Sequence, residues 1–161
     1  AGFEEEEADQ VYGALCRSSR RRLQKTLDKI TVSELYSEPR IAKQAAKEGM
    51  RQGSSIDLKT GYDLSKQADQ RRAWRALQAE DPDLIMICPP CGPFSQMQAI
   101  NYARMSMQKA VALLGEGLHH LEFAMKVYEW QVRRGKIAIF EHPDRSKAWE
   151  EERVQIGRAH V

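Results

Sequence analysis

Cysteine is scarce in this chain, and long apolar runs are missing from it. The 161 residues include three cysteines at uneven spacing, which excludes the disulfide framework of a small secreted protein. We therefore expect a reducing, intracellular setting, either nuclear or cytoplasmic. No stretch approaches the roughly 20 apolar residues that a membrane span needs, and the first residues lack the pattern of a signal peptide. No membrane partner is expected.

Excess charge of one sign is also missing. Lys and Arg together number 25 and Asp and Glu 23, so the formal net charge of +2 does not predict nucleic-acid binding from bulk electrostatics. The charge is nevertheless patterned near the start, where residues 4–7 are acidic and a basic cluster follows. That cluster comprises Arg17, Arg20, Arg21, Arg22, Lys25 and Lys29. Because this order complements a helix dipole, it is typical of a solvated helix.

The length predicts one domain with short additions at both ends. Residues 1–29 contain an amphipathic pattern over residues 3–28, residues 30–150 form the domain, and residues 151–161 are a tail without a pattern. The last six residues, IGRAHV, are similar to the translation of a common sequencing-library adapter, and the chain starts with Ala1. We therefore expect the natural protein to continue past the printed residues, and we exclude His160 from any site.

Strand patterns and helix patterns alternate along the domain. We predict strands at residues 30–35, 50–58, 84–88 and 136–140, and helices at residues 40–48, 66–80 and 106–134. The runs LIMI and KIAIF are continuously apolar, which is typical of strands buried on both faces. The alternation predicts an α/β fold, a Rossmann-like three-layer sandwich with a mainly parallel sheet. Because we expect the natural protein to continue past the printed residues, we expect this sheet to be truncated at its C-terminal side.

Polar residues follow each predicted strand, in the segments SELYSEP, IDLKTGYDL, CPPCGPFS and EHPDRS. In open parallel sheets, ligands bind beyond the carboxyl ends of the strands. The sequence therefore predicts a functional site at this one edge.

Cys91 is the candidate nucleophile within CPPCGPFS. Pro89 and Pro90 stiffen the approach to it, because proline fixes φ and removes a backbone donor. Phe94 could form an aromatic wall, and Ser95 could supply a hydroxyl group or a helix cap.

Two other interpretations of the cysteines stay open. Cys88 and Cys91 form a CxxC after a strand, as in thioredoxin-like oxidoreductases, although no aromatic residue precedes Cys88. A structural zinc site would need a second ligand pair. The remaining candidates do not have a suitable spacing: Cys16, His119, His120 and His142. We therefore expect no metal.

The stretch PPCGPFS resembles the Pro-Pro-Cys-x-x-Phe-Ser motif of DNA cytosine-5 methyltransferases. The resemblance implies that Cys91 attacks carbon 6 of a flipped-out cytosine and that Glu141, after the next strand, engages the ring nitrogen and the amine of the base. His142 and Pro143 stand where the family has Asn and Val. The substrate-binding residues implied are Pro90, Phe94, Ser95, Asn101 and His142.

The same resemblance implies S-adenosyl-L-methionine as cofactor. The family's first strand leads into a Gly-rich turn, whereas here the turn has no glycine and holds Glu34, Tyr36 and Ser37. Asp57 would bind the ribose hydroxyls and Asp63 the adenine amine, and Pro89 completes the cofactor side. The partner implied is nucleic acid, with DNA favoured over RNA.

The glycine-free turn also leaves a non-enzymatic alternative. ELYSEPR, CGPFSQMQ and FEHP are similar to methyltransferase-like segments of mobile-element polyproteins. In that case the domain would be a catalytically degenerate passenger that folds without binding the cofactor. The sequence does not predict an oligomeric state.

Overall fold

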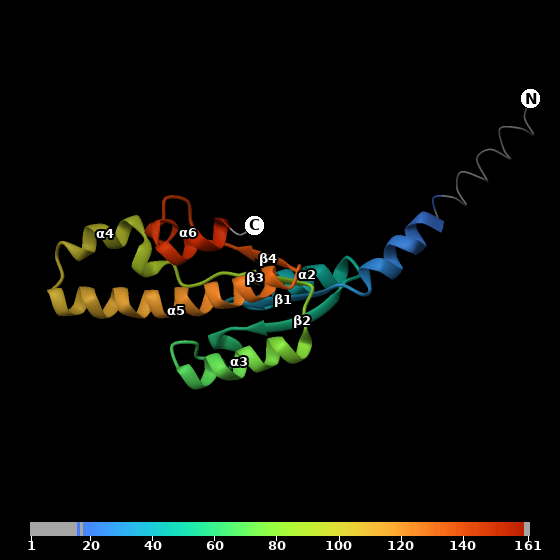
Figure 1. The fold of residues 1–161 in the computed structure, drawn as a ribbon, viewed down its shortest axis with the longest axis horizontal. Coiled ribbons are helices and arrows are strands. Elements are labelled where there is room, and N and C mark those ends of the chain that lie inside the picture. Colours follow the sequence, from blue (N-terminus) through green and yellow to red (C-terminus); the bar gives the residue numbers. More distant parts are fainter. Residues whose placement is uncertain (1–15, 17, 160–161) are drawn as a thin grey trace, which may run out of the picture.

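The structure, a computed structural model, describes residue 16 and residues 18–159. Its principal elements are β1 (Thr31–Leu35), α2 (Ile41–Lys47), β2 (Arg51–Ile56), α3 (Gln67–Glu80), β3 (Leu84–Ile87), α4 (Gln96–Tyr102), α5 (Met107–Arg133), β4 (Ile137–Phe140) and α6 (Glu152–Ala159). Short 3-10 turns lie at Leu58–Thr60, Gly92–Phe94 and Lys147–Glu150. A helix over residues 18–27 precedes β1 and extends away from the domain (Figure 1). The rest of the helix predicted over residues 3–28 lies outside the described residues.

The four strands form one parallel sheet in the order β2-β1-β3-β4. All four predicted strands are confirmed, each within two residues of its predicted ends. Because the strands are parallel, the loops that follow them all leave the sheet at the same edge. The α/β, Rossmann-like fold expected from the alternation is therefore present.

Neighbouring residues of β1 point to opposite faces of the sheet and so identify its two helical layers. The Glu34 carboxylate accepts hydrogen bonds from the backbone of α2, whereas the Ser33 hydroxyl donates to Glu80 at the end of α3 (2.6 Å). Side chains alternate between faces along a strand, so α2 lies on one face and α3 on the other. α5 packs on the same face as α3, which completes three layers.

The principal core lies between the sheet and the pair α3 and α5. Leu35, Ile85 and Ile87 from the strands are fully buried there against Leu77 of α3 and Val127 of α5. Trp74, Tyr128 and Trp130 pack around this cluster. A smaller cluster under the loop after β3 contains Phe94, Leu121, Met125, Ala148 and Val154.

On the opposite face α2 packs against β1 and β2, whereas within the described part of the chain the β4 side chains on that face stay exposed. Ile137 and Ile139 of β4 are 58% and 44% exposed, and their register partners Leu84 and Met86 are half-buried. The prediction that KIAIF is a strand buried on both faces is therefore wrong in its burial. The reason is the strand order: β4 lies at the edge of the sheet, beyond the reach of α2.

Two short helices were not predicted. α4 follows the Cys91 loop, and α6 covers residues that were expected to be a patternless tail. α6 packs because Val154 and Gly157 are buried, and Gly157 lies directly against Met125 of α5. α5 itself follows the N-cap residue Ser106 and continues through both of its glycines. Within residue 16 and residues 18–159, no helix has the length and hydropathy to cross a bilayer.

Candidate active site at the carboxyl edge of the sheet

The residues that follow the strands lie side by side along one edge. In sheet order they are Asp57 after β2, Tyr36 after β1, Cys88 after β3 and Glu141 after β4. The ladders continue past the strand ends, since Cys88 N donates to Leu35 O (3.0 Å) and Glu141 N donates to Ile87 O (2.9 Å). With strands about 4.8 Å apart, the row from Asp57 to Glu141 spans roughly 14 Å. The residues that follow the four strands therefore share one edge of the sheet, as the sequence predicts.

Cys91 stands on a rigid loop with its side chain in solvent. Pro89 is buried under the loop, whereas Pro90 and Cys91 are exposed. The Cys91 carbonyl accepts from Phe94 N (3.1 Å), which closes a 3-10 turn over Gly92–Phe94. Ser95 then caps α4, because its hydroxyl oxygen accepts from Gln98 N (3.1 Å) and donates to Gly92 O (3.0 Å). The thiol is thus presented by backbone that has little freedom to move.

Gly117 of α5 lets this loop approach the helix. A Cβ at that position would lie 2.7 Å from Pro93 Cβ and 3.1 Å from Phe94 Cε2, closer than atoms can pack. Phe94 fills the resulting contact and is 2% exposed, between α5 and α6. The structure therefore places Phe94 in the core instead of on a pocket wall. Its role is to hold the Cys91 loop.

The loop after β4 packs against the Cys91 loop. Glu141 is exposed, whereas the next residue, His142, is 7% exposed. The His142 ring lies among Phe94, Phe140 and Trp149, with ring centroids 6.1–6.2 Å away. Ser146 adds a hydrogen bond to Phe94 O (3.3 Å). Glu141 and Cys91 are thus carried by two loops that contact each other.

Burial keeps His142 uncharged. Neither ring nitrogen has a hydrogen-bond partner among the described residues. Burial lowers the pKa of His142, and the negative charge of Glu141 and the carbonyl of Pro90 oppose this only in part. A neutral, enclosed imidazole is suited to packing, so direct contact of His142 with a substrate, expected from the sequence, would need the loop to open.

Cys88 has the opposite environment to Cys91. It is half-buried, and its pKa is raised to about 11, first by burial and then by the charges of Glu141 and Glu34. A thiol with this pKa stays protonated near neutral pH, whereas the reactive cysteine of a CxxC redox pair has a lowered pKa. Cys88 is therefore poorly suited to attack as a thiolate near neutral pH, and of these two cysteines Cys91 is the better candidate for a nucleophile.

This contrast predicts the order in which the two thiols react. With iodoacetamide at pH 8, Cys91 should be alkylated well before Cys88, since only about one Cys88 in a thousand is then a thiolate. Alkylation of Cys88 should accelerate as the pH rises toward 11. Time-resolved peptide mass mapping measures both rates. Faster alkylation of Cys88 than of Cys91 at pH 8 would contradict the burial described above.

On the cofactor side, Glu34 is withdrawn from the edge. It is fully buried, and its carboxylate accepts from Ala42 N (2.6 Å) and Arg40 N (3.2 Å) at the start of α2. That helix has no side-chain cap of its own, so Glu34 supplies the missing acceptor. The structure thus gives Glu34 a structural role instead of the ligand contact expected from the sequence.

Tyr36 is not a glycine, but it adopts a backbone conformation that is typical of glycine. Its φ of 61° lies in the left-handed region, which non-glycine residues adopt infrequently. The side chain crosses to α5, where the hydroxyl donates to His120 O (3.1 Å) and the ring meets the His120 ring edge-on. Burial raises the pKa of Tyr36. The turn after β1 is therefore filled by an aromatic ring.

The remaining residues on the cofactor side differ in how far their side chains are already hydrogen-bonded within the chain. Asp57 Oδ1 accepts from Lys59 N (2.9 Å), and the Asp57 side chain forms a capping box with Thr60 at the start of the 3-10 turn. Ser37 donates to Glu38 O (2.9 Å) and can still accept a hydrogen bond. Asp63 is occupied by Ser65 and Lys66, whose contacts lower its pKa to about 2. Asp57 and Ser37 fit a ribose-bearing ligand, whereas the buried Pro89 does not.

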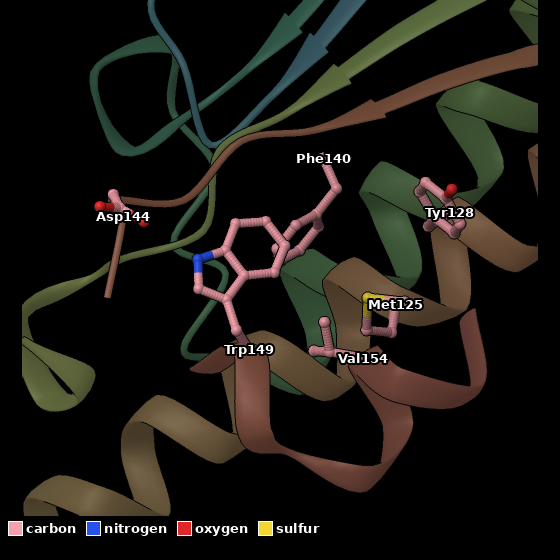
Figure 2. Close-up of a pocket in the computed structure, with 6 residues that line it drawn as sticks. All are labelled: Met125, Tyr128, Phe140, Asp144, Trp149 and Val154. Atoms are coloured by element: carbon pink, nitrogen blue, oxygen red, sulfur yellow. The ribbon is translucent and has the colours of Figure 1, made fainter. Parts of the chain in front are cut away.

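A hollow of about 520 Å³ lies beside β4, and the sequence does not predict it. Figure 2 shows its lining, in which Trp149 stands against Phe140 and the apolar side chains of α5 and α6 close the opposite wall. The lining residues are Met125, Tyr128, Phe140, Asp144, Trp149 and Val154. Neither Cys91 nor Glu141 contributes to it, so this hollow is separate from the edge site.

Asn101 and Tyr102 do not converge on Cys91. Asn101 is exposed on α4, and the Tyr102 hydroxyl donates to Pro93 O (2.8 Å), which braces the loop from its far side.

Among the described residues, no three His, Cys, Asp or Glu side chains are grouped so that they could hold a metal ion. Comparison of the chain with protein-family models, curated proteins and solved structures found no match.

Proposed function

We propose that this domain transfers a methyl group to carbon 5 of cytosine in DNA through a covalent adduct with Cys91. One observation carries the proposal: an exposed cysteine on a rigid loop after β3 lies against the loop after β4 that carries an exposed glutamate. The similarity of PPCGPFS to the cytosine-5 methyltransferase motif gives these two residues their roles. Other residue pairs along the edge do not combine a solvent-exposed thiol with a carboxyl group.

The two side chains have complementary tasks. The Cys91 thiolate forms a bond to carbon 6, and the electron pair of the 5,6 double bond moves into the ring. The Glu141 carboxyl group engages the ring nitrogen and neutralises the charge that develops there. Carbon 5 becomes nucleophilic as a result. The methyl group would come from the sulfonium of the donor, whose sulfur–methyl bond breaks so that the donor leaves as a neutral thioether. The proton on carbon 5 then leaves to water, and the bond between the Cys91 sulfur and carbon 6 breaks, which regenerates the thiolate.

Carbon 6 is inaccessible within a stacked duplex, so the target base must leave the helix before attack. S-Adenosyl-L-methionine supplies the electrophilic methyl group when it is bound. In this chain Asp57 would hold the ribose hydroxyls and Ser37 a further polar group, with the Tyr36 ring as the wall of the turn. This edge of the sheet adjoins Cys88 and the loop that leads to Cys91.

The degenerate-domain alternative is favoured by a specific observation on the same side. The Tyr36 ring fills the turn after β1, and the carboxylates of Glu34 and Asp63 are already engaged within the chain. A domain with these features could keep the nucleophile loop and lose the cofactor. The two alternatives differ in ligand binding and not in fold.

A covalent trapping assay tests the proposed function. Fluorine at carbon 5 replaces the hydrogen that must leave, so a duplex that contains 5-fluorocytosine should remain attached to the protein after methyl transfer. We expect a denaturation-resistant protein–DNA band when the chain, this duplex and S-adenosyl-L-methionine are combined, and none with 5-fluorouracil in the same sequence. Calorimetry with the cofactor alone distinguishes the alternatives: no heat up to millimolar ligand, together with no band, would identify a degenerate domain.

A further inference from the structure

A groove between α3 and α5 lies outside the edge site. It measures about 650 Å³ and opens on the sheet face opposite α2. Figure 1 shows α3 and α5 as two separate helices, with α3 below α5 in this view. The groove is lined by Gln67, Gln70, Arg71, Trp74, Arg75, His119, Glu122, Phe123, Lys126, Glu129 and Arg153. The mechanism proposed above uses none of these residues.

The charges in this groove are unbalanced in favour of cations. Both of its carboxylates are already paired, Glu122 with Arg153 (2.9 Å) and Glu129 with Arg133 (3.3 Å). Three exposed cations have no carboxylate partner among the described residues, and these are Arg71, Arg75 and Lys126. An anion placed here would therefore meet positive charge that the fold itself does not neutralise.

The positions of the three cations favour a ligand with several spaced negative groups. Arg71 and Arg75 are one turn apart on α3, and Arg75 Nε donates to Arg71 O (3.3 Å), which keeps the two guanidinium groups on one side of the helix. Lys126 reaches across from α5 and lies 4.6 Å from the centroid of the Trp74 ring. The groove is therefore cationic on both of its walls.

The floor of the groove favours phosphates over bases. One neighbour of the Trp74 ring is Lys126, and another is Trp130, whose ring centroid is 5.3 Å away. Since the aromatic surface is occupied in this way, little of it remains for a base to stack on. The guanidinium groups, in contrast, match phosphate oxygens in charge and geometry.

We infer that the groove between α3 and α5 binds the phosphodiester backbone of a nucleic acid, independently of its sequence. The choice of a nucleic acid over other polyanions rests on the proposed function. The groove also lies close to the candidate active site, because His119 lines the groove and the adjacent His120 contacts Tyr36 at the carboxyl edge of the sheet. A strand that leaves the Cys91 site along this face would meet Arg71, Arg75 and Lys126.

The salt dependence of binding tests this inference. The probe is a fluorescein-labelled duplex of 20 base pairs with unmodified cytosines, followed by anisotropy from 50 to 200 mM NaCl. Each phosphate contact contributes about 0.9 to the slope of log affinity against log salt, so R71Q/R75Q should flatten the slope by about 2 and weaken binding roughly tenfold. The control K43Q/K47Q removes the same charge from exposed positions one turn apart on α2, on the other face; it should leave the slope nearly unchanged.

Equal slopes for wild type and R71Q/R75Q, or equal losses in the two double variants, would overturn the inference. So would poly-L-glutamate that competes with the duplex as well as an unlabelled duplex does. The trapping assay separates this result from the proposed function: R71Q/R75Q should still form the 5-fluorocytosine adduct at saturating DNA. A flattened slope without any adduct in wild type would support the groove and reject the methyl-transfer proposal.

Discussion

C91S is expected to abolish the covalent adduct with 5-fluorocytosine DNA. The thiolate is the attacking species, and serine at the same position has no comparably acidic proton to lose, so the adduct yield should fall by about two orders of magnitude or more. The side chain is exposed on its loop, and the loop is held by Phe94 and Ser95 instead of by the sulfur atom. The variant should therefore fold normally and still bind the duplex, as anisotropy would show.

C88S is the matched control. Cys88 is half-buried with its pKa raised to about 11, so it contributes little thiolate at neutral pH and its removal should leave most of the adduct in place. A thermal melt checks that the new hydroxyl has not unfolded the domain. If both serine variants lost the adduct equally while remaining folded, the two sulfur atoms would act together, and a dithiol function would replace the one proposed.

E34A should cause the largest loss of stability among the substitutions considered. The carboxylate of Glu34 accepts from two backbone N–H groups of α2, one of them fully buried. Each N–H group left without a partner costs roughly 1–3 kcal/mol, and the cavity adds to this, so the free energy of unfolding should fall by about 3 kcal/mol or more. A domain of this size has about 5–15 kcal/mol in total. Urea denaturation followed by circular dichroism measures the change.

Two controls identify the hydrogen bonds as the cause. E34Q keeps the shape and one acceptor oxygen, but it places an amide donor beside a backbone donor. Its free energy of unfolding should therefore lie between those of wild type and E34A. E48A removes a carboxylate from an exposed position at the other end of the same helix and should change stability by less than about 0.5 kcal/mol. A stability of E34A within 1 kcal/mol of wild type would contradict the role assigned to Glu34.

The convergence of the candidate residues at one edge of the sheet could be predicted from the sequence because it depends on local patterns. Apolar runs of four or five residues, separated by helix-forming stretches, identify the strands, and parallel strands bring their following loops to one edge. Cys91 and Glu141 directly follow two such runs. The pairing of β3 with β4 then places their loops against each other without any further information.

The direction of individual side chains could not be predicted in the same way. The sequence predicts Glu34 in the site because it is polar and close to a strand end, yet alternation along β1 turns it toward α2, which begins at Ile41 and has no side-chain cap of its own. Phe94 was assigned to a pocket wall, but a single 3-10 turn directs its ring toward Gly117 of α5. Both outcomes depend on a partner that is distant in the sequence.

Burial of β4 and the groove between α3 and α5 depend on the sheet order, which no local pattern specifies. LIMI and IAIF are similar in composition, yet one lies in the middle of the sheet and the other at its edge. Arg71 and Arg75 are typical of a solvated helix face when α3 is considered alone. Only the packing of α5 beside α3 brings Lys126 to the same groove.

The incomplete cover over β4 has a consequence for how the domain behaves in water. Ile137 and Ile139 lie next to Leu84 and Met86 and form an exposed apolar strip. β4 is an edge strand, so the backbone groups on its outer side have no partner strand in the sheet. Each 100 Å² of such surface raises the free energy of the isolated chain by about 2.5 kcal/mol, and that amount is recovered in any arrangement that shields it. We therefore expect the exposed edge strand β4, and not the charged helices, to limit the solubility of this domain.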